Sequence, residues 1–122
     1  MEKIYTTKVQ KLGSMVEAFK GEKMMIMFNE NAPEELADYC VLHRGNRLTS
    51  IVEAGDIFKT AEETYEVVYV GNQVQKNLKD LGHITLRFNN NCEGESLEGS
   101  LYLEDKAIVD IKPGIEISIM RP

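Results

Sequence analysis

The sequence predicts an all-β protein, mainly antiparallel and barrel-like or sandwich-like, with two or three short helices. Three observations favour this class: most apolar residues lie in short alternating or β-branched runs, turn residues separate these runs, and the helical patterns are brief. The 122 residues are enough for one domain, residues 1–122, with one contiguous core.

Eight segments have the strand pattern. The last one alternates most clearly, because Ile115, Ile117 and Ile119 share one face and Pro113-Gly114 supplies a turn before them. We therefore expect this isoleucine face to lie in the core. The expected strands are Lys3–Lys11, Lys23–Asn29, Tyr39–His43, Arg47–Glu53, Thr64–Gly71, Ile84–Asn89, Leu97–Leu103 and Ile115–Met120.

Short helices are predicted over Met15–Lys20, Pro33–Ala37 and Gln73–Leu81. Ser14 and Glu17 have the spacing of a capping box, and Gly21 would end the first helix in a left-handed conformation. Pro33 suits the first turn of the second helix, where a missing N–H costs no hydrogen bond. Gly82 is expected to stop the third helix.

The composition limits the partners and the compartment. A net charge of −6 opposes binding to nucleic acid, since such binding relies on lysine and arginine. The apolar runs are too short to enter a membrane, and the first residues lack a secretory signal, so we expect a cytoplasmic protein. In that reducing compartment Cys40 and Cys92 would be free thiols, with Cys40 buried.

The two histidines each lie where a strand-like run meets a turn. His43 ends the run Tyr39-Cys40-Val41-Leu42, and His83 follows Gly82. Imidazole, with an ordinary pKa of about 6.5, is the side chain best suited to act as a neutral nucleophile or proton carrier near pH 7. From the local sequence alone, however, a structural role in a turn is the commoner outcome for each histidine, more so for His83.

Other chemistries have weaker support. No Cys-x-x-Cys, His-x-His or His-Glu-x-x-His spacing is present, so we predict no metal site, although Cys40, Cys92, His43 and His83 could form one if they folded together. The chain also lacks the Gly-x-Ser-x-Gly elbow of hydrolases and the glycine-rich loops that bind nucleotides. We therefore predict no cofactor, and a metal-dependent enzyme using both histidines stays a rival hypothesis.

Three segments and a turn carry a family resemblance. They are Met27-Phe28-Asn29-Glu30-Asn31-Ala32-Pro33 with Leu36, then Tyr39–His43, then Asn77-Leu78-Lys79-Asp80-Leu81-Gly82-His83-Ile84-Thr85-Leu86-Arg87-Phe88, and finally Pro113-Gly114. From Ile4 to about Ile119 the chain resembles the glucitol/sorbitol-specific enzyme IIA family of the bacterial phosphoenolpyruvate-dependent sugar phosphotransferase system (PTS).

The resemblance implies a phosphocarrier. His43 would accept a phosphoryl group from the small phosphocarrier HPr and pass it to the IIB domain of a IIB/IIC sugar permease, in which glucitol or sorbitol is the expected sugar. Arg44-Gly45 stands where some relatives have a second histidine, which leaves His83 as the candidate helper. Arg44 and Arg87 are candidates to stabilise the charge on the transferred group.

Such a carrier needs a shallow site with an exposed acceptor ring, so we expect His43 to be exposed and dispensable for folding. Around it we expect an apolar patch with an acidic rim that includes Glu34 and Glu35. The rival from another class is a non-catalytic β-barrel interaction module with structural histidines. A homodimer is compatible with the sequence, because eight strands leave edges to cover.

Overall fold

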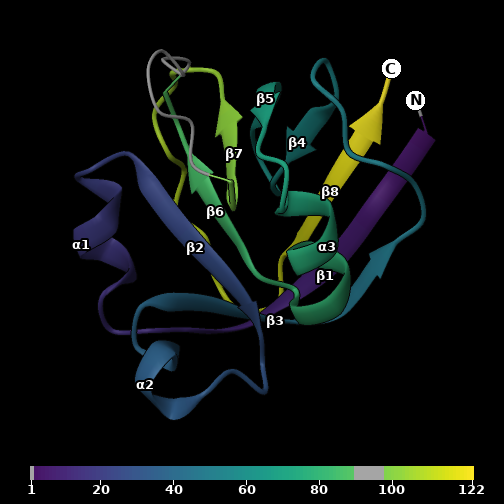
Figure 1. The fold of residues 1–122 in the computed structure, drawn as a ribbon. Helices are drawn as coiled ribbons and strands as arrows, with labels where there is room; N and C mark the ends of the chain where they lie inside the picture. The colour runs from purple at the N-terminus through teal and green to yellow at the C-terminus, as the bar shows by residue number, and fades with distance from the viewer. Residues whose placement is uncertain (1, 90–97) are drawn as a thin grey trace.

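The computed structural model describes residues 2–89 and 98–122, and in these ranges eight strands form a closed barrel in the order β1-β3-β2-β6-β7-β5-β4-β8 (Figure 1). The all-β barrel with three short helices is thus confirmed. The strands are β1 (Glu2–Leu12), β2 (Met24–Asn29), β3 (Cys40–Leu48), β4 (Ile57–Lys59), β5 (Thr64–Val70), β6 (Ile84–Arg87), β7 (Ser100–Leu103) and β8 (Glu116–Arg121), and the helices are α1 (Val16–Lys20), α2 (Glu34–Ala37) and α3 (Val74–Leu81).

Strand β1 closes the barrel, because it pairs antiparallel with β3 along one edge and with β8 along the other. The pairs β2–β3 and β6–β7 are parallel, and the remaining pairs of the described residues are antiparallel. Figure 1 shows the N-terminal strand β1 beside the C-terminal strand β8. A closed barrel has no open sheet edge, so the argument for a homodimer from uncovered edges is wrong.

Strand β3 differs from the prediction. We expected one strand to end at His43 and another to begin at Arg47, but β3 runs without interruption from Cys40 to Leu48. Gly45 and Asn46 have positive φ angles of 112° and 36°, and the register with β1 shifts beside them. These residues therefore form a bulge within a strand, which the turn-like composition Arg-Gly-Asn does not distinguish from a loop.

Two further strand predictions needed correction. Residues 49–56 are irregular, so the expected strand Arg47–Glu53 does not exist beyond the end of β3, and the short strand β4 was missed. Of the expected strand Leu97–Leu103, the structure has Ser100–Leu103 as β7, whereas Leu97 lies outside the described residues, as does Cys92.

The barrel interior is filled by aliphatic and aromatic side chains, including the fully buried Tyr5, Phe58 and Tyr65. Ile117 and Ile119 of β8 are buried there as predicted, and Ile115 is partly buried against them. A smaller second cluster lies on the other side of β2 and β3, where Phe28, Cys40 and Leu42 pack with Ala32 and Ala37 at α2. We had expected one contiguous core.

Burial of Cys40 is confirmed, and it raises the pKa of this thiol to about 11. A thiol in that environment stays protonated near neutral pH and is a poor nucleophile.

The helix ends follow the predictions only in part. Ser14 does not cap α1, whose N-cap is Met15 without a side-chain hydrogen bond, and Gly21 has a right-handed φ of −63°. Gly82 does end α3 in the left-handed conformation, with a φ of 61°. Among the described residues, the helices are all too short and too polar to cross a lipid bilayer.

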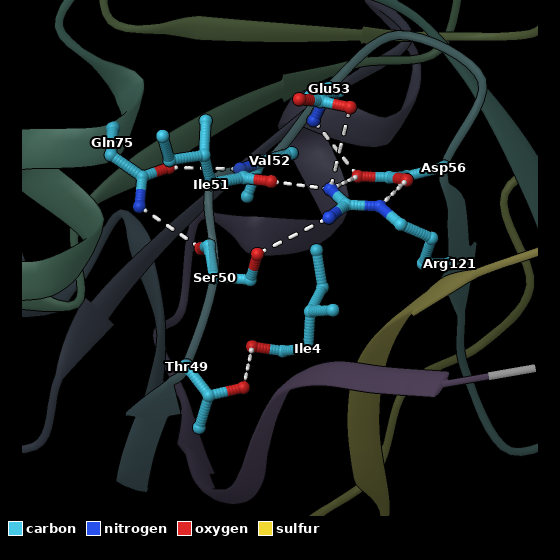
Figure 2. A network of polar contacts seen from close by, with 9 residues as sticks. All are labelled: Ile4, Thr49, Ser50, Ile51, Val52, Glu53, Asp56, Gln75 and Arg121. Atoms are coloured by element: carbon cyan, nitrogen blue, oxygen red, sulfur yellow. Dashed lines mark hydrogen bonds and ion pairs between the residues drawn. The ribbon is translucent and has the colours of Figure 1, made fainter.

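The irregular segment 49–56 is held by polar contacts from two sides (Figure 2). On one side, Gln75 of α3 accepts from the Val52 N–H at 3.0 Å and donates to the Ser50 carbonyl at 3.1 Å. On the other, Arg121 of β8 donates to both carboxylate oxygens of Asp56, at 3.0 and 3.1 Å. The Asp56 side chain is only 4% exposed and also accepts from the Glu53 N–H at 2.8 Å.

We predict that Asp56→Ala lowers the free energy of unfolding by about 1–3 kcal/mol, since it removes a buried acceptor from the Glu53 N–H. Urea denaturation measures the change. Lys3→Ala is the control, because it breaks an ion pair with Glu116 whose two side chains are 46% and 52% exposed, and it should cost less than about 1 kcal/mol. Equal losses in the two variants would contradict this account.

Candidate functional site

His43 lies in the middle of β3, at the place where the barrel is least regular. It is opposite Val9 of β1 and Asn29 at the end of β2. The register of β1 and β3 shifts on both sides of the pair Val9–His43. Irregular pairing of this kind re-aims a side chain, and it recurs next to active sites.

The His43 ring is enclosed and both of its nitrogens have partners. Nε2 lies 2.8 Å from the Gly82 carbonyl oxygen, and Nδ1 lies 2.6 Å from the Thr7 hydroxyl. A carbonyl oxygen can only accept, so Nε2 carries the proton in this contact and the neutral ring has its lone pair on Nδ1. Burial lowers the pKa of His43, which favours the neutral form needed in a nucleophile.

The expected exposure of His43 is wrong: the residue is 0% exposed. The prediction placed it at the end of a strand, whereas β3 continues through the bulge and carries the ring into the barrel wall. The expectation that its removal leaves the fold intact rested on that exposure. In the structure a smaller residue would leave the Gly82 carbonyl and the Thr7 hydroxyl without this partner, so we now expect a loss of stability.

Thr7 and Asn46 support the ring and were missed in the sequence. Thr7 lies opposite the bulge, between two register positions of β1, and its hydroxyl also contacts the Arg44 carbonyl at 3.0 Å and the Asn46 N–H at 3.2 Å. The Asn46 side chain accepts from the Tyr5 hydroxyl at 2.7 Å and donates to the Leu78 carbonyl at 2.8 Å. The sequence held one signal for Thr7: alternation along the strand puts it on the same inward face as Tyr5 and Val9, where a polar residue is unusual.

Gly82, at the end of α3, covers His43 closely. A Cβ atom built on Gly82 would lie 2.8 Å from His43 Cε1 and would also collide with the side-chain amide of Asn29. Its φ of 61° independently favours glycine. Residue 82 therefore needs to be glycine both for the helix end and for the space of the imidazole.

A cleft of about 370 Å³ lies beside His43, and Arg44 is one of the residues that line it. The Arg44 guanidinium binds both carboxylate oxygens of Glu30, at 2.5 and 2.8 Å, and its side chain is 70% exposed. The structure thus brings this predicted cation to the mouth of the site. Other residues of the cleft wall are Asn29, Asn31, Gly45 and Asn46.

His83 directly follows Gly82 and precedes β6. In the barrel order β2 therefore lies between it and His43 of β3. Its Nδ1 lies 3.2 Å from the Met27 carbonyl, and its ring is 4.8 Å from the Phe28 ring. The carbonyl contact puts the proton on Nδ1, so Nε2 bears the lone pair, and Nε2 has no hydrogen-bond partner among the described residues. Unlike His43, this residue is only partly buried.

Arg87 is not part of this site. It lies opposite Met24 on β2, whereas His43 lies opposite Asn29, five residues further along the same strand. At about 3.3 Å per residue the separation along β2 is roughly 16 Å. Arg87 instead donates to the Ser100 hydroxyl of β7 at 3.0 Å.

In residues 2–89 and 98–122 no three histidine, cysteine, aspartate or glutamate side chains gather as a metal site would require.

The comparisons with known proteins identify the family. The family model described as "PTS system glucitol/sorbitol-specific IIA component" matches residues 4–118, so the chain belongs to this family of the bacterial phosphotransferase system. It is 33% identical over 114 residues to the PTS system glucitol/sorbitol-specific EIIA components of Shigella flexneri and Escherichia coli K12, covering 93% of this chain and 92% of each relative. These matches confirm the resemblance seen in the sequence.

A solved structure shares the fold. The PTS system IIA component from Enterococcus faecalis V583 superposes with a TM-score of 0.85 at 23% identity, covering 94% of this chain and 98% of that one.

We predict that Gly82→Ala lowers the free energy of unfolding by more than the roughly 1–2 kcal/mol of a left-handed alanine, because the new methyl group also meets His43. The matched control is Gly55→Ala, where φ is 96° and a Cβ meets nothing within 4 Å. Urea denaturation gives both losses, and NMR signals of the His43 ring should shift only in Gly82→Ala. Identical behaviour of the two variants would refute the packing argument.

Proposed function

We propose that this protein is a cytoplasmic phosphocarrier that accepts a phosphoryl group from phospho-HPr on His43 and donates it to the IIB domain of a sugar permease, with glucitol or sorbitol as the sugar. The observation that carries the proposal is a neutral imidazole, held in one orientation by Thr7 and Gly82 beside a cleft with an arginine, in a chain of this family.

Acceptance requires the ring to be uncovered, and Nε2 is the nitrogen that is easier to release. Its one contact is the carbonyl of Gly82 in the turn between α3 and β6. Nδ1 instead faces Thr7, whose residue is 3% exposed and belongs to a strand paired on both sides. A local movement of the turn frees Nε2, whereas access to Nδ1 would disturb the barrel wall.

The chain's own residues then supply alignment and charge. Phosphoryl transfer spreads negative charge over three equatorial oxygens, so a positioned nucleophile and nearby cations contribute most. Arg44 is exposed at the mouth of the cleft and can bind these oxygens. To do so it would give up its ion pair with Glu30. His83 is the proposed helper, because the turn that covers His43 also carries His83.

Two specific observations favour other candidates. Nε2 of His83 has no hydrogen-bond partner among the described residues and the residue is partly exposed, so His83 is a second candidate acceptor. The complete hydrogen bonding of the buried His43 ring also suits a structural histidine in a non-catalytic interaction module. Both alternatives make different predictions for the protein's mass after phosphorylation.

We predict that the protein gains the mass of one phosphoryl group when mixed with phosphoenolpyruvate, enzyme I and HPr, and that His43→Gln gains none. Glutamine retains polar atoms in the buried site, which limits the loss of stability. His83→Ala should still be phosphorylated, because the acceptor atom on His43 stays in place. The rate should fall about tenfold, because the helper is lost. Intact mass spectrometry under conditions that preserve the acid-labile P–N bond measures each outcome.

The same measurement separates the alternatives. A phosphoryl group mapped to the peptide of His83, and still present in His43→Gln, would assign the acceptor role to His83. No gain of mass in the wild-type protein would favour the interaction module. Circular dichroism of each variant checks that it is folded.

We further predict that reversing Glu34 and Glu35 to lysine slows association with HPr by about tenfold at low salt. Both residues are exposed on α2, which lies in the connection from β2 to β3, four residues after Glu30. The control reverses Glu62 and Glu66, which are exposed at β5 and the turn before it and carry the same charge change. Surface plasmon resonance at two salt concentrations measures the rates, and equal slowing by both pairs would contradict an acidic rim around the site.

A further inference from the structure

One group beside His43 can exchange its hydrogen-bonding role. The Gly82 carbonyl that contacts Nε2 only accepts, whereas the Thr7 hydroxyl that contacts Nδ1 at 2.6 Å can either donate or accept. The same hydroxyl lies 3.0 Å from the Arg44 carbonyl, which offers its hydrogen another acceptor. The Asn46 N–H donates to it at 3.2 Å in either case.

These contacts permit two complete arrangements on the Nδ1 side of the ring. With the ring proton on Nε2, Nε2 donates to Gly82 and Thr7 donates to Nδ1. With the proton on Nδ1, Nδ1 donates to Thr7 and the Thr7 hydrogen turns to the Arg44 carbonyl. In the second arrangement the Nε2 lone pair would face the Gly82 oxygen with no hydrogen between them, which is repulsive, so this arrangement belongs to the state in which the Gly82 turn has moved away from Nε2.

We propose that Thr7 is a positioning residue that holds the Nδ1–H form of His43 while Nε2 takes up the phosphoryl group; this inference rests on the proposed phosphocarrier function. In the transfer step the Nε2–P bond forms as the bond from phosphorus to the donor atom breaks, and the electron pair of that bond stays on the donor. The Nδ1 proton stays on the ring, bound to Thr7. The change of tautomer comes earlier, while the turn is open: Nδ1 takes up a proton from water and Nε2 gives one to water, so that the ring attacks as the neutral Nδ1–H form.

The place of the Thr7 hydroxyl is set by the barrel and not by the ring. Thr7 is 3% exposed and lies opposite the bulge at Gly45 and Asn46. Asn46 is itself held by Tyr5 and by the Leu78 carbonyl at the end of α3. The hydroxyl therefore keeps its position when the Gly82 turn moves away, and it orients the freed imidazole toward the donor.

The test compares Thr7→Val, which keeps the size of the side chain without the hydroxyl, with Thr7→Ser, which keeps the hydroxyl. We expect Thr7→Val to accept the phosphoryl group at least about tenfold more slowly than the wild type, the effect of one lost hydrogen bond. Thr7→Ser should be close to the wild-type rate. The neighbouring Thr6→Val, which loses a hydroxyl bonded to Glu116, is the matched control and should leave the rate unchanged.

Nitrogen-15 NMR of the His43 ring supplies a readout that general destabilisation would not change, and it needs only the wild-type protein. Before phosphorylation we expect the proton on Nε2, and afterwards phosphorus on Nε2 with a protonated Nδ1. Phosphorus on Nδ1 would overturn the inference even if Thr7→Val failed to fold.

The kinetic outcomes are also separable. A Thr7→Val protein phosphorylated as fast as the wild type would overturn the role of Thr7 alone. A wild-type protein that gains no phosphoryl group would overturn the proposed function and this inference together.

Discussion

The pairing of β1 with β3 is the constraint on which the rest of the structure depends. Strand β1 closes the barrel by pairing with β3 along one edge and with β8 along the other. The β1–β3 pairing contains both register shifts that flank His43. The bulge at Gly45 and Asn46 gives the Thr7 hydroxyl three polar neighbours in place of a regular ladder position. The irregular backbone thereby places the Thr7 hydroxyl where it fixes the orientation of the His43 ring.

The contacts that orient the His43 ring also close it off from solvent. The ring is neutral and held at both nitrogens, which suits a nucleophile, yet it is covered. The covering element is small: one glycine turn after α3, placed against Asn29 and the ring. Asn46 and Gln75 tie α3 to the rest of the barrel, so opening confined to the turn leaves the helix in place. For the phosphocarrier proposed above, opening of this small turn against a firmly bonded barrel wall would reconcile the burial of His43 with access for a visiting donor.

Much of the fold follows from local patterns. The alternation of isoleucines in the last strand predicted its buried face, and Gly82 predicted the end of α3, because each signal needs only neighbouring residues. The errors occurred where distant residues decide. The Arg-Gly-Asn sequence looks like a turn, but pairing with β1 keeps it inside β3. Ser14 matches a capping box, but the chain enters α1 through Met15.

By itself the sequence determined the class of fold, the family and the two histidines that could carry chemistry, since periodicity and motifs are properties of contiguous residues. Only the tertiary structure decided that His43 is buried, that Thr7 and Gly82 are its partners, and that Arg44 but not Arg87 reaches the cleft. These facts arise from the register between strands and from the docking of α3. Both depend on contacts between residues about 35 to 40 positions apart, which no local pattern encodes.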